Sequence, residues 1–393
     1  MNILFLMKVY EVGGQEVVTS VLANCFLKHG HRVSIASFKQ PNSMMVERTD
    51  SHIHFYTLGK FECSSNQISK LRNILKQEHI DIVINQWGLP YVPIKVLKKA
   101  KKGLNVKTIS IYHNSPDTNA RIKEVEIAIS KTSNILKKLI LRFKKEIYRQ
   151  VTSRSMRYVY NNSNLYMVLS SSFVDKFKTF TNISHPNKLI VQTNPVTIET
   201  NSFQYIKENK QKEIIYMGRI DYNQKRVYRV IDTWKELEKK YPDWKLTIIG
   251  DGPERVNLEQ QAKTFNLEHI TFEGFQSPNA YYERASILIL TSEYEGFPLV
   301  LIECMSFGVI PVVYGSYSAV YDIIKHKKNG MIVQPQKGDF SKQEMITQLS
   351  FLMNNEELRN TMAQEAIQAS KEGYSLEVIY RSWEKIFNQL SIK

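Results

Sequence analysis

Residues 287–303 read ILILTSEYEGFPLVLIE, and this stretch decides the fold class of the chain. A continuous apolar run ends near Thr291, a loop containing Gly296 follows, and Pro298 opens a second apolar stretch of helical character. An apolar run without polar alternation is typical of a parallel strand that is covered by helices on both faces. The stretch therefore predicts a strand, a loop and a helix of an α/β domain.

Similar apolar or β-branched runs recur along the chain, separated by longer helical patterns. The runs are 2–7, 32–38, 82–86, 107–112, 165–170, 189–194, 213–218, 245–250, 270–273, 310–313 and 331–333. A polar stretch over 197–211 divides them into two series. We predict an α/β protein of two Rossmann-like doubly wound domains, an N-terminal domain over 1–196 and a C-terminal domain over 197–374. The helical pattern within 375–393 leaves two alternatives open: the helix docks on its own domain, or it crosses back onto the first.

Length and composition agree with a folded protein of two domains. A chain of 393 residues exceeds what one core usually organises, and 42% hydrophobic with 23% charged residues excludes a disordered or fibrous protein. Three separated cysteines without a C-x-x-C pair indicate neither a disulfide framework nor a zinc site, so we expect a reducing compartment. The first apolar run is too short for a signal peptide, and the uncharged stretch 304–321 is too rich in Gly, Pro and Ser for a membrane span.

Positive charge is concentrated in the first half of the chain. Residues 1–195 contain 29 Lys and Arg against 12 Asp and Glu, a net charge of +17, whereas the remaining 24 against 26 give −2. Such an excess indicates a polyanionic partner: nucleic acid, an anionic membrane face or a phosphorylated substrate. No nucleic-acid recognition module is present, so nucleic acid is the least favoured partner.

The segment 134–150 has the pattern of a basic amphipathic helix. One face holds apolar residues and the other holds cations: Ile135, Leu136, Leu139, Ile140, Phe143 and Ile147 against Lys137, Lys138, Arg142, Lys144, Lys145 and Arg149. The favoured interpretation is a helix that packs its apolar face on the first domain's sheet and presents its cations to solvent. The alternative is a helix that lies on an anionic membrane. In both cases the cations are able to meet lipid headgroups.

Two strand-to-helix turns have features that suit phosphate groups. Gly13 and Gly14 follow the first strand, where a close backbone and a helix N-terminus favour an anion, although the G-x-G-x-x-G fingerprint is absent and a plain tight turn is equally compatible. Gly218-Arg219 and Gln224-Lys225-Arg226 lie in one loop of the second domain. Arg219 and Lys225 could clamp a diphosphate there, and solvated surface cations are the alternative.

Carboxylates and a histidine complete the candidate residues. Glu295 lies in a loop and Glu303 lies eight residues later in the following helix, so each could accept hydrogen bonds from vicinal hydroxyls. The backbone N–H groups from Gly296 to Leu299 would face a phosphate or a sugar. His113 ends the strand 107–112, at the strand end where α/β sheets bind ligands. For these residues the alternatives are a solvated helix-terminal Glu and a structural turn histidine.

The order of these motifs resembles the retaining nucleotide-sugar glycosyltransferases of family 4, which have the GT-B fold. The motifs are Gly218-Arg219, Gln224-Lys225-Arg226, Gly250-Asp251-Gly252-Pro253-Glu254, Glu273-Gly274, the E-x7-E arrangement from Glu295 to Glu303, and Gly330 before a strand. The resemblance is strong over 213–334 and weaker through Gly13-Gly14, His113 and Asn194-Pro195. Asp322, where the family often has Glu, and residues 317–320, which lack the usual small turn residues, depart from the pattern.

The resemblance implies two Rossmann-like domains that face each other across a cleft, and a role for each matching residue. Arg219 and Lys225 would hold the donor diphosphate, and Glu303 would bind the ribose hydroxyls. Glu295, with the backbone of Gly296, Phe297 and Leu299, would hold the transferred sugar, and His113 would lie near that sugar. The base would lie near Gly250, Gly274 and Phe275. No metal and no other cofactor is expected, because cations and helix N-termini would stabilise the leaving diphosphate.

The expected activity is transfer of a hexose-type sugar from a nucleotide sugar, with UDP as the expected nucleotide. The resemblance and the basic first domain imply a lipid-linked or oligosaccharide acceptor in surface-polysaccharide biosynthesis. The expected location is cytoplasmic, with peripheral contact to the inner membrane face. Two alternatives stay open: a nucleotide-sugar epimerase of GT-B architecture, and a non-catalytic homologue that binds sugar nucleotides or membranes.

Overall fold

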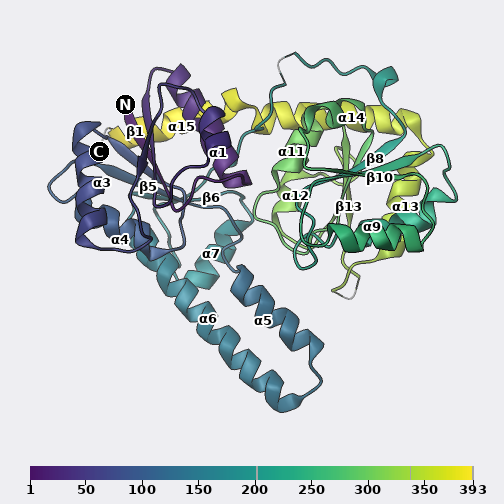
Figure 1. The fold of residues 1–393 in the computed structure, drawn as a ribbon, viewed down its shortest axis with the longest axis horizontal. Helices are drawn as coiled ribbons and strands as arrows, with labels where there is room; N and C mark the ends of the chain where they lie inside the picture. Colours follow the sequence, from purple (N-terminus) through teal and green to yellow (C-terminus); the bar gives the residue numbers. More distant parts are fainter. Residues whose placement is uncertain (201, 337, 392–393) are drawn as a thin grey trace. The chain divides into compact units, whose positions relative to one another are not determined.

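The computed structural model describes residues 1–200, 202–336 and 338–391, which form two compact units. The first unit contains Met1–Asn194 with Ile379–Lys393, and the second contains Pro195–Val378. Each unit is built on one parallel sheet whose strands are connected by helices (Figure 1). The predicted pair of Rossmann-like α/β domains is therefore confirmed. Residues 392 and 393 of the predicted last helix lie outside the described residues.

The sheet of the first unit has the strand order β3-β2-β1-β4-β5-β6-β7. Its strands are β1 (Asn2–Met7), β2 (Arg32–Ser37), β3 (His54–Thr57), β4 (Ile82–Asn85), β5 (Lys107–Tyr112), β6 (Leu165–Val168) and β7 (Leu189–Val191). Its helices are α1 (Gly14–Lys28), α2 (Ser43–Glu47), α3 (Ser65–Gln77), α4 (Tyr91–Ala100), α5 (Ala120–Lys131), α6 (Ile135–Asn161), α7 (Phe173–Thr181) and α15 (Leu376–Ser391). The strand order reverses between β1 and β4, so the loops after these strands flank the switch point at which such sheets bind ligands.

The edge strand β3 was not among the predicted strands. It pairs with β2 in parallel register, Ser34 opposite His54. Its four residues are only partly buried because it has a neighbour on one side alone. An edge strand therefore lacks the continuous apolar run by which the central strands are recognised.

The C-terminal helix α15 packs on the first unit from Ile379 onward. The Phe26 ring lies 5.6 Å from Trp383 and 5.2 Å from Phe387. Ser382 Oγ donates a hydrogen bond of 2.7 Å to Gln192 Oε1. These contacts tie the end of the chain to α1 and to the last strand of the first sheet.

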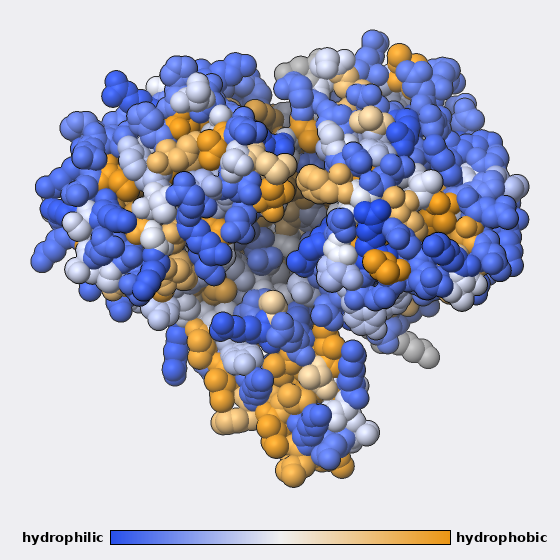
Figure 2. Space-filling model, in the orientation of Figure 1, coloured by the Kyte–Doolittle hydropathy of each residue, from blue (hydrophilic) through white to orange (hydrophobic). Residues whose placement is uncertain are grey.

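Helices α5 and α6 form a hairpin that extends away from the first sheet (Figure 1). The C-terminal part of α6 is buried through Met156 and Val159, whereas its N-terminal part exposes the apolar side chains of 135–147. The exposed fractions run from 44% for Ile147 to 77% for Ile135, and Figure 2 shows apolar side chains gathered over this hairpin. The favoured interpretation, that this face packs on the sheet, is wrong because α6 extends beyond the sheet and α5 contacts its polar side.

The sheet of the second unit has the strand order β10-β9-β8-β11-β12-β13. Its strands are β8 (Glu213–Met217), β9 (Lys245–Ile249), β10 (Ile270–Gly274), β11 (Ile287–Leu290), β12 (Ile310–Tyr314) and β13 (Met331–Val333). Its helices are α8 (Tyr228–Glu238), α9 (Arg255–Thr264), α10 (Asn279–Arg284), α11 (Leu299–Ser306), α12 (Ala319–Ile323), α13 (Lys342–Met353) and α14 (Glu356–Tyr374), with a 3₁₀ turn at Lys207–Asn209. The order reverses between β8 and β11, which places the loops after these two strands at the switch point.

Candidate functional site

The loop after β8 positions two of the predicted cations. Asp221 Oδ1 accepts hydrogen bonds from the backbone N–H of Gln224 at 2.7 Å and of Lys225 at 3.2 Å. Arg226 then takes a left-handed conformation with φ of 54° and closes the turn before α8. A carboxylate that accepts from the backbone a few residues on is a common way to fix a tight turn. Asp221 therefore sets the position of Lys225, a role that the sequence analysis missed.

Lys225 and Glu295 form a partly buried ion pair at the switch point. Lys225 Nζ lies 2.6 Å from Glu295 Oε1, and the two side chains are 15% and 7% exposed. Gln224 Nε2 donates to the other oxygen, Oε2, at 3.2 Å and to the Tyr294 carbonyl at 3.2 Å. The structure thus brings together two residues that the sequence places in different motifs. Each charge has a partner, so a ligand that takes up Lys225 would also free the Glu295 carboxylate.

Arg219 is the exposed cation of the same loop. Its side chain is 64% exposed, and its Nη2 lies 2.7 Å from Asp221 Oδ2 and 3.4 Å from Gln224 Oε1. Gln224 therefore contacts Arg219 with one end of its amide and Glu295 with the other. Arg219, Gln224, Glu295 and Lys225 form one connected polar network, which we call the strand-end network.

A second group of charges supports the loop after β11. Glu293 lies 3.0 Å from Arg229 and 3.8 Å from Arg226. Arg229 also donates to the Thr291 carbonyl at 3.3 Å, and the Glu293 backbone N–H donates to the Gln224 carbonyl at 2.7 Å. These contacts join the loops after β8 and β11. Glu293 was not among the predicted site residues. Its position two residues before Glu295, in the same loop, was a signal that it could belong to the site.

Three buried hydroxyls in the loops after β11 and β12 have no hydrogen-bond partner among the described residues. They belong to Ser292, after β11, and to Tyr317 and Ser318, after β12. Burial and, secondly, the negative charge of Glu295 raise the pKa of Tyr317 well above its usual value. Tyr317 therefore keeps its proton and can donate a hydrogen bond at this end of the sheet.

Glu303 lies on α11 and is more enclosed than its predicted role suggests. It is 7% exposed and accepts hydrogen bonds from the hydroxyls of Thr197 and Tyr282, the latter at 3.4 Å. Phe297 is equally buried and packs against Tyr374, with ring centroids 5.7 Å apart. Leu299 opens α11, whose first N–H groups have no acceptor within the helix.

Glycines bring the ends of β8, β9 and β10 into close contact. A Cβ on Gly250 would lie 1.9 Å from the Gly218 carbonyl oxygen, and Gly250 has φ of 135°. Its N–H donates to the Gly274 carbonyl at 2.7 Å. Only glycine fits this backbone approach. Phe275 follows Gly274 with a 69% exposed ring, which leaves a flat apolar surface beside these strand ends.

The switch point of the first unit combines a cation with uncharged polar side chains. Lys8, directly after β1, places its Nζ 5.3 Å from the centroid of the Trp87 ring, which follows β4. Gly13 caps α1, and a Cβ there would lie 2.6 Å from Glu16 Oε2, so the Glu16 carboxyl occupies the region of the helix N-terminus. Burial raises the pKa of Glu16. His113 Nε2 lies 2.7 Å from Gln86 Oε1, which follows β4. Burial lowers the pKa of His113 to about 3, so its ring is uncharged at neutral pH and is a poor general base.

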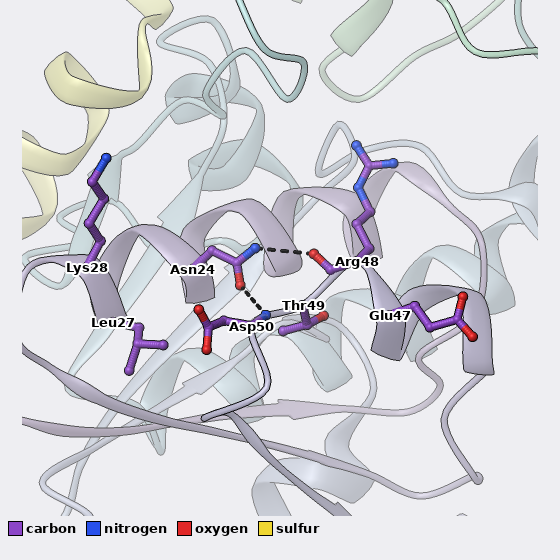
Figure 3. Close-up of a pocket in the computed structure, with 7 residues that line it drawn as sticks. All are labelled: Asn24, Leu27, Lys28, Glu47, Arg48, Thr49 and Asp50. Atoms are coloured by element: carbon purple, nitrogen blue, oxygen red, sulfur yellow. Dashed lines mark hydrogen bonds between the residues drawn. The ribbon is translucent and has the colours of Figure 1, made fainter.

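A surface pocket on the first unit lies at the other end of its sheet. Figure 3 shows its lining residues: Asn24, Leu27, Lys28, Glu47, Arg48, Thr49 and Asp50. Asn24 bridges its two sides by donating to the Arg48 carbonyl at 3.2 Å and accepting from the Asp50 N–H at 2.9 Å. These residues precede β2 and β3, at the amino ends of the strands. Ligands of such sheets bind at the carboxyl ends, so we assign this pocket no part in the site.

Neither a metal-binding cluster nor a membrane-spanning helix occurs among the described residues. Within the residues that the structure describes, no three His, Cys, Asp or Glu side chains gather closely enough to hold a metal ion. No helix in the described ranges combines the length and the apolar content needed to cross a bilayer.

Two Rossmann-like units in one chain have the architecture of the GT-B class of transferases. Residues 12–200 match the profile described as Glycosyltransferase Family 4, and residues 197–369 match Glycosyl transferases group 1. The chain belongs to this family of glycosyltransferases and is an enzyme of the transferase class.

Relatives of nearly equal length support the assignment. The chain is 28% identical to an uncharacterized glycosyltransferase of Haemophilus influenzae, over 97% of this chain and 98% of that protein. It is 25% identical, over 99% of both chains, to a Campylobacter jejuni α-1,4-N-acetyl-D-galactosaminyltransferase whose name gives a diNAcBac-PP-undecaprenol glycan as its substrate.

Solved structures show the same fold. The lipopolysaccharide outer core galactosyltransferase WaaB superposes with a TM-score of 0.70 at 20% identity, over 99% of this chain and all of that one. Anabaena HepE in complex with UDP-glucose superposes with a TM-score of 0.74 at 15% identity, with the same coverage. The expected GT-B architecture is thereby confirmed.

Proposed function

We propose that this glycosyltransferase moves a hexose-type sugar from a UDP-sugar to a lipid-linked or oligosaccharide acceptor in bacterial surface-polysaccharide assembly. The observation that carries the proposal is the ion pair of Lys225 and Glu295 beside the exposed Arg219. Two cations on one loop suit a diphosphate, and a carboxylate beside them suits sugar hydroxyls. The UDP-glucose complex of HepE and the undecaprenol-linked substrate of the Campylobacter relative support the donor and acceptor classes.

In this proposal Arg219 and Lys225 bind the diphosphate, and Lys225 exchanges Glu295 for a phosphate oxygen. Glu295 then accepts hydrogen bonds from the transferred sugar, together with the backbone of Gly296, Phe297 and Leu299. Glu303 accepts hydrogen bonds from the ribose hydroxyls. The Thr197 and Tyr282 hydroxyls, which donate to Glu303 in this structure, then give up those hydrogen bonds. The base lies near Gly250, Gly274 and Phe275, whose exposed ring offers a stacking surface.

The proposed reaction retains the anomeric configuration. The bond from the anomeric carbon to the diphosphate oxygen breaks while the acceptor oxygen bonds on the same face, and the acceptor proton passes to the departing phosphate oxygen. Arg219 and Lys225 offset the charge that develops on the diphosphate. No side chain is assigned as nucleophile, and the neutral His113 contributes hydrogen bonding near the sugar rather than a base.

We also propose that the reaction needs no metal, since two side-chain cations serve the diphosphate. Excess chelator should leave the turnover rate unchanged, and a loss that Mg²⁺ or Mn²⁺ restores would contradict this. The proposed location is the cytoplasmic face of the membrane, where the net charge of +17 in residues 1–195 attracts anionic lipid.

The test is incubation of the full chain with a panel of nucleotide sugars, with and without lipid-linked acceptors, followed by measurement of nucleoside diphosphate release. We expect acceptor-dependent release from a UDP-sugar and a product of retained configuration. An altered sugar without diphosphate release would identify an epimerase. Binding without turnover on every acceptor would identify a non-catalytic homologue.

A further inference from the structure

We propose that the α5–α6 hairpin inserts an apolar face of α6 into an anionic lipid bilayer. This face, which we call the α6 apolar face, consists of Ile135, Leu136, Leu139, Ile140, Phe143, Ile147 and Val151, all at least 44% exposed. The inference rests on the proposed function only in that a lipid-linked acceptor gives a membrane contact its use. The proposed function includes attraction of the basic first half to anionic lipid. The present proposal adds the insertion of the α6 apolar face into the bilayer.

The arrangement of the hairpin is the reverse of ordinary helix packing. Helices in a hairpin usually bury their apolar stripes against each other. Here α5 contacts the polar side of α6, where Glu126 pairs with Lys145 at 2.8 Å and Asn119 Nδ2 donates to Thr152 Oγ1 at 3.1 Å. The α6 apolar face therefore points away from α5. Large apolar patches that a chain leaves exposed mark sites of protein or membrane interaction.

The charges beside the α6 apolar face select the kind of surface it meets. Residues 134–150 contain six cations and one carboxylate, Glu146, which pairs with Arg149 at 3.0 Å. At 100° per residue, Arg142 and Lys144 border the two sides of the apolar face. A helix with an apolar stripe between cations fits the interface of an anionic bilayer, with the stripe among acyl chains and the cations among headgroups.

A second copy of the chain is a poorer partner for this face. Two α6 apolar faces in contact would bring their bordering cations together, and like charges oppose association. The helix has 27 residues and is about 40 Å long at 1.5 Å per residue, so the exposed part can lie along a membrane while the buried part stays in the first unit.

The test is sedimentation of the full chain with vesicles of phosphatidylglycerol and phosphatidylethanolamine, at low and high salt. The apolar variant carries Ile140→Ser and Phe143→Ser, and the matched control carries Met44→Ser and Val256→Ser, which are equally exposed elsewhere. We expect the wild type and the control to keep part of their binding at high salt. The apolar variant should bind at least tenfold more weakly at both salt concentrations, because each large apolar side chain is worth about tenfold in transfer.

A spectroscopic measurement tests insertion directly. The Phe143→Trp variant places a fluorophore at the hairpin, and brominated anionic lipid should quench it. Trp234, Trp244 and Trp383 are buried, and the wild type, which shares them and the partly buried Trp87, gives the background signal. Equal vesicle binding by the apolar variant and the wild type, or no quenching at position 143, would overturn the proposal. Dimers in lipid-free solution that the apolar variant dissociates would show that a second copy covers the face.

Activity assays separate this proposal from the proposed function. The apolar variant should transfer sugar normally to a short, water-soluble acceptor and poorly to an acceptor embedded in vesicles. Equal rates of the apolar variant on both acceptors would show that the α6 apolar face is not needed to reach a membrane-embedded acceptor. A wild type that transfers to neither acceptor while binding vesicles as expected would refute the proposed function alone.

Discussion

The two units build the same edge of the same kind of sheet with different chemistry. In the second unit, residues that follow β8 and β11 meet in ion pairs, Lys225 with Glu295 and Arg229 with Glu293. In the first unit, the strand ends hold Lys8 beside the Trp87 ring, 5.3 Å from its centroid, and an uncharged His113 against the Gln86 amide, with a pKa that burial lowers to about 3. The comparison teaches that the topology supplies the place, whereas loop residues decide whether it suits a charged phosphate or neutral hydroxyls.

The half of the chain that contains the charged strand-end network is not the half with the large net charge. The second half of the chain is nearly neutral although its strand-end network is charged, because its cations are matched by carboxylates. The first half carries +17, and eight of its cations lie on α6 rather than at the strand ends. In our proposals, net charge therefore marks the surface that meets the membrane and not the proposed diphosphate site.

The largest effect is expected from Lys225→Ala in the second unit. Turnover should fall about 100-fold, since the cation is positioned by Asp221 and partly buried, and the free energy of unfolding should also fall because Glu295 loses its partner. The matched control is Lys328→Ala, whose exposed pair with Glu365 at 3.4 Å should matter little. Similar turnover rates of the two variants in steady-state kinetics would show that the Lys225–Glu295 pair matters no more for transfer than the exposed Lys328–Glu365 pair.

Gly250→Ala should show how far the strand ends of the second unit depend on close backbone contact. The added Cβ meets the Gly218 carbonyl oxygen, so we expect a loss of about 3 kcal/mol in the free energy of unfolding. Gly373→Ala is the control, because no atom lies within 4 Å of its Cβ position. Denaturant unfolding that finds both variants equally stable would show that the strand ends can separate without cost.

The two carboxylates of the E-x7-E arrangement should separate in nucleotide binding. Glu303→Gln should weaken UDP binding about tenfold, because a charge-assisted bond to the ribose is lost. Glu295→Gln should leave UDP binding within a few-fold, since free UDP has no sugar, while it reduces transfer. Calorimetry that finds equal losses of UDP affinity would end this division of roles.

The smallest effect concerns the uncharged His113 of the first unit. An unfolded His113 protonates below its ordinary pKa of about 6.5, whereas the folded one stays neutral down to about 3. Its contribution to stability is therefore complete above pH 6.5 and is lost as the pH falls, by about 1–2 kcal/mol at pH 5. NMR titration of the His113 ring should show no protonation at pH 5; a midpoint near 6.5 would contradict an uncharged, buried ring.

Most of the fold was predictable because buried parallel strands are apolar throughout. Twelve strands are visible as runs in the sequence, and each of them appears in the structure within a few residues. β3 was not predictable in this way, since a partly exposed edge strand has no such run. The amphipathic pattern of α6 predicted a helix with two faces, but a pattern contains no information on which face a neighbour covers.

The site was predictable where a motif is local and was missed where distant loops meet. Arg219, Lys225, Glu295 and Glu303 stand in short motifs. The contact between Lys225 and Glu295 joins residues 70 positions apart, and it depends on β8 lying beside β11. Glu293 joins the two loops only through that meeting, whereas Asp221 acts within its own loop, and the spacing from Asp221 to Gln224 was a signal for a capped turn.

The central claim is that the strand-end network of the second unit binds the diphosphate of the donor. Calorimetric titration of the wild type and of the Arg219→Ala, Lys225→Ala double variant, each with UDP and with uridine, tests it most directly. The account predicts that the wild type binds UDP at least 100-fold more tightly than uridine and that the double variant loses this preference while it still binds uridine. A double variant that keeps the preference for UDP would contradict the claim.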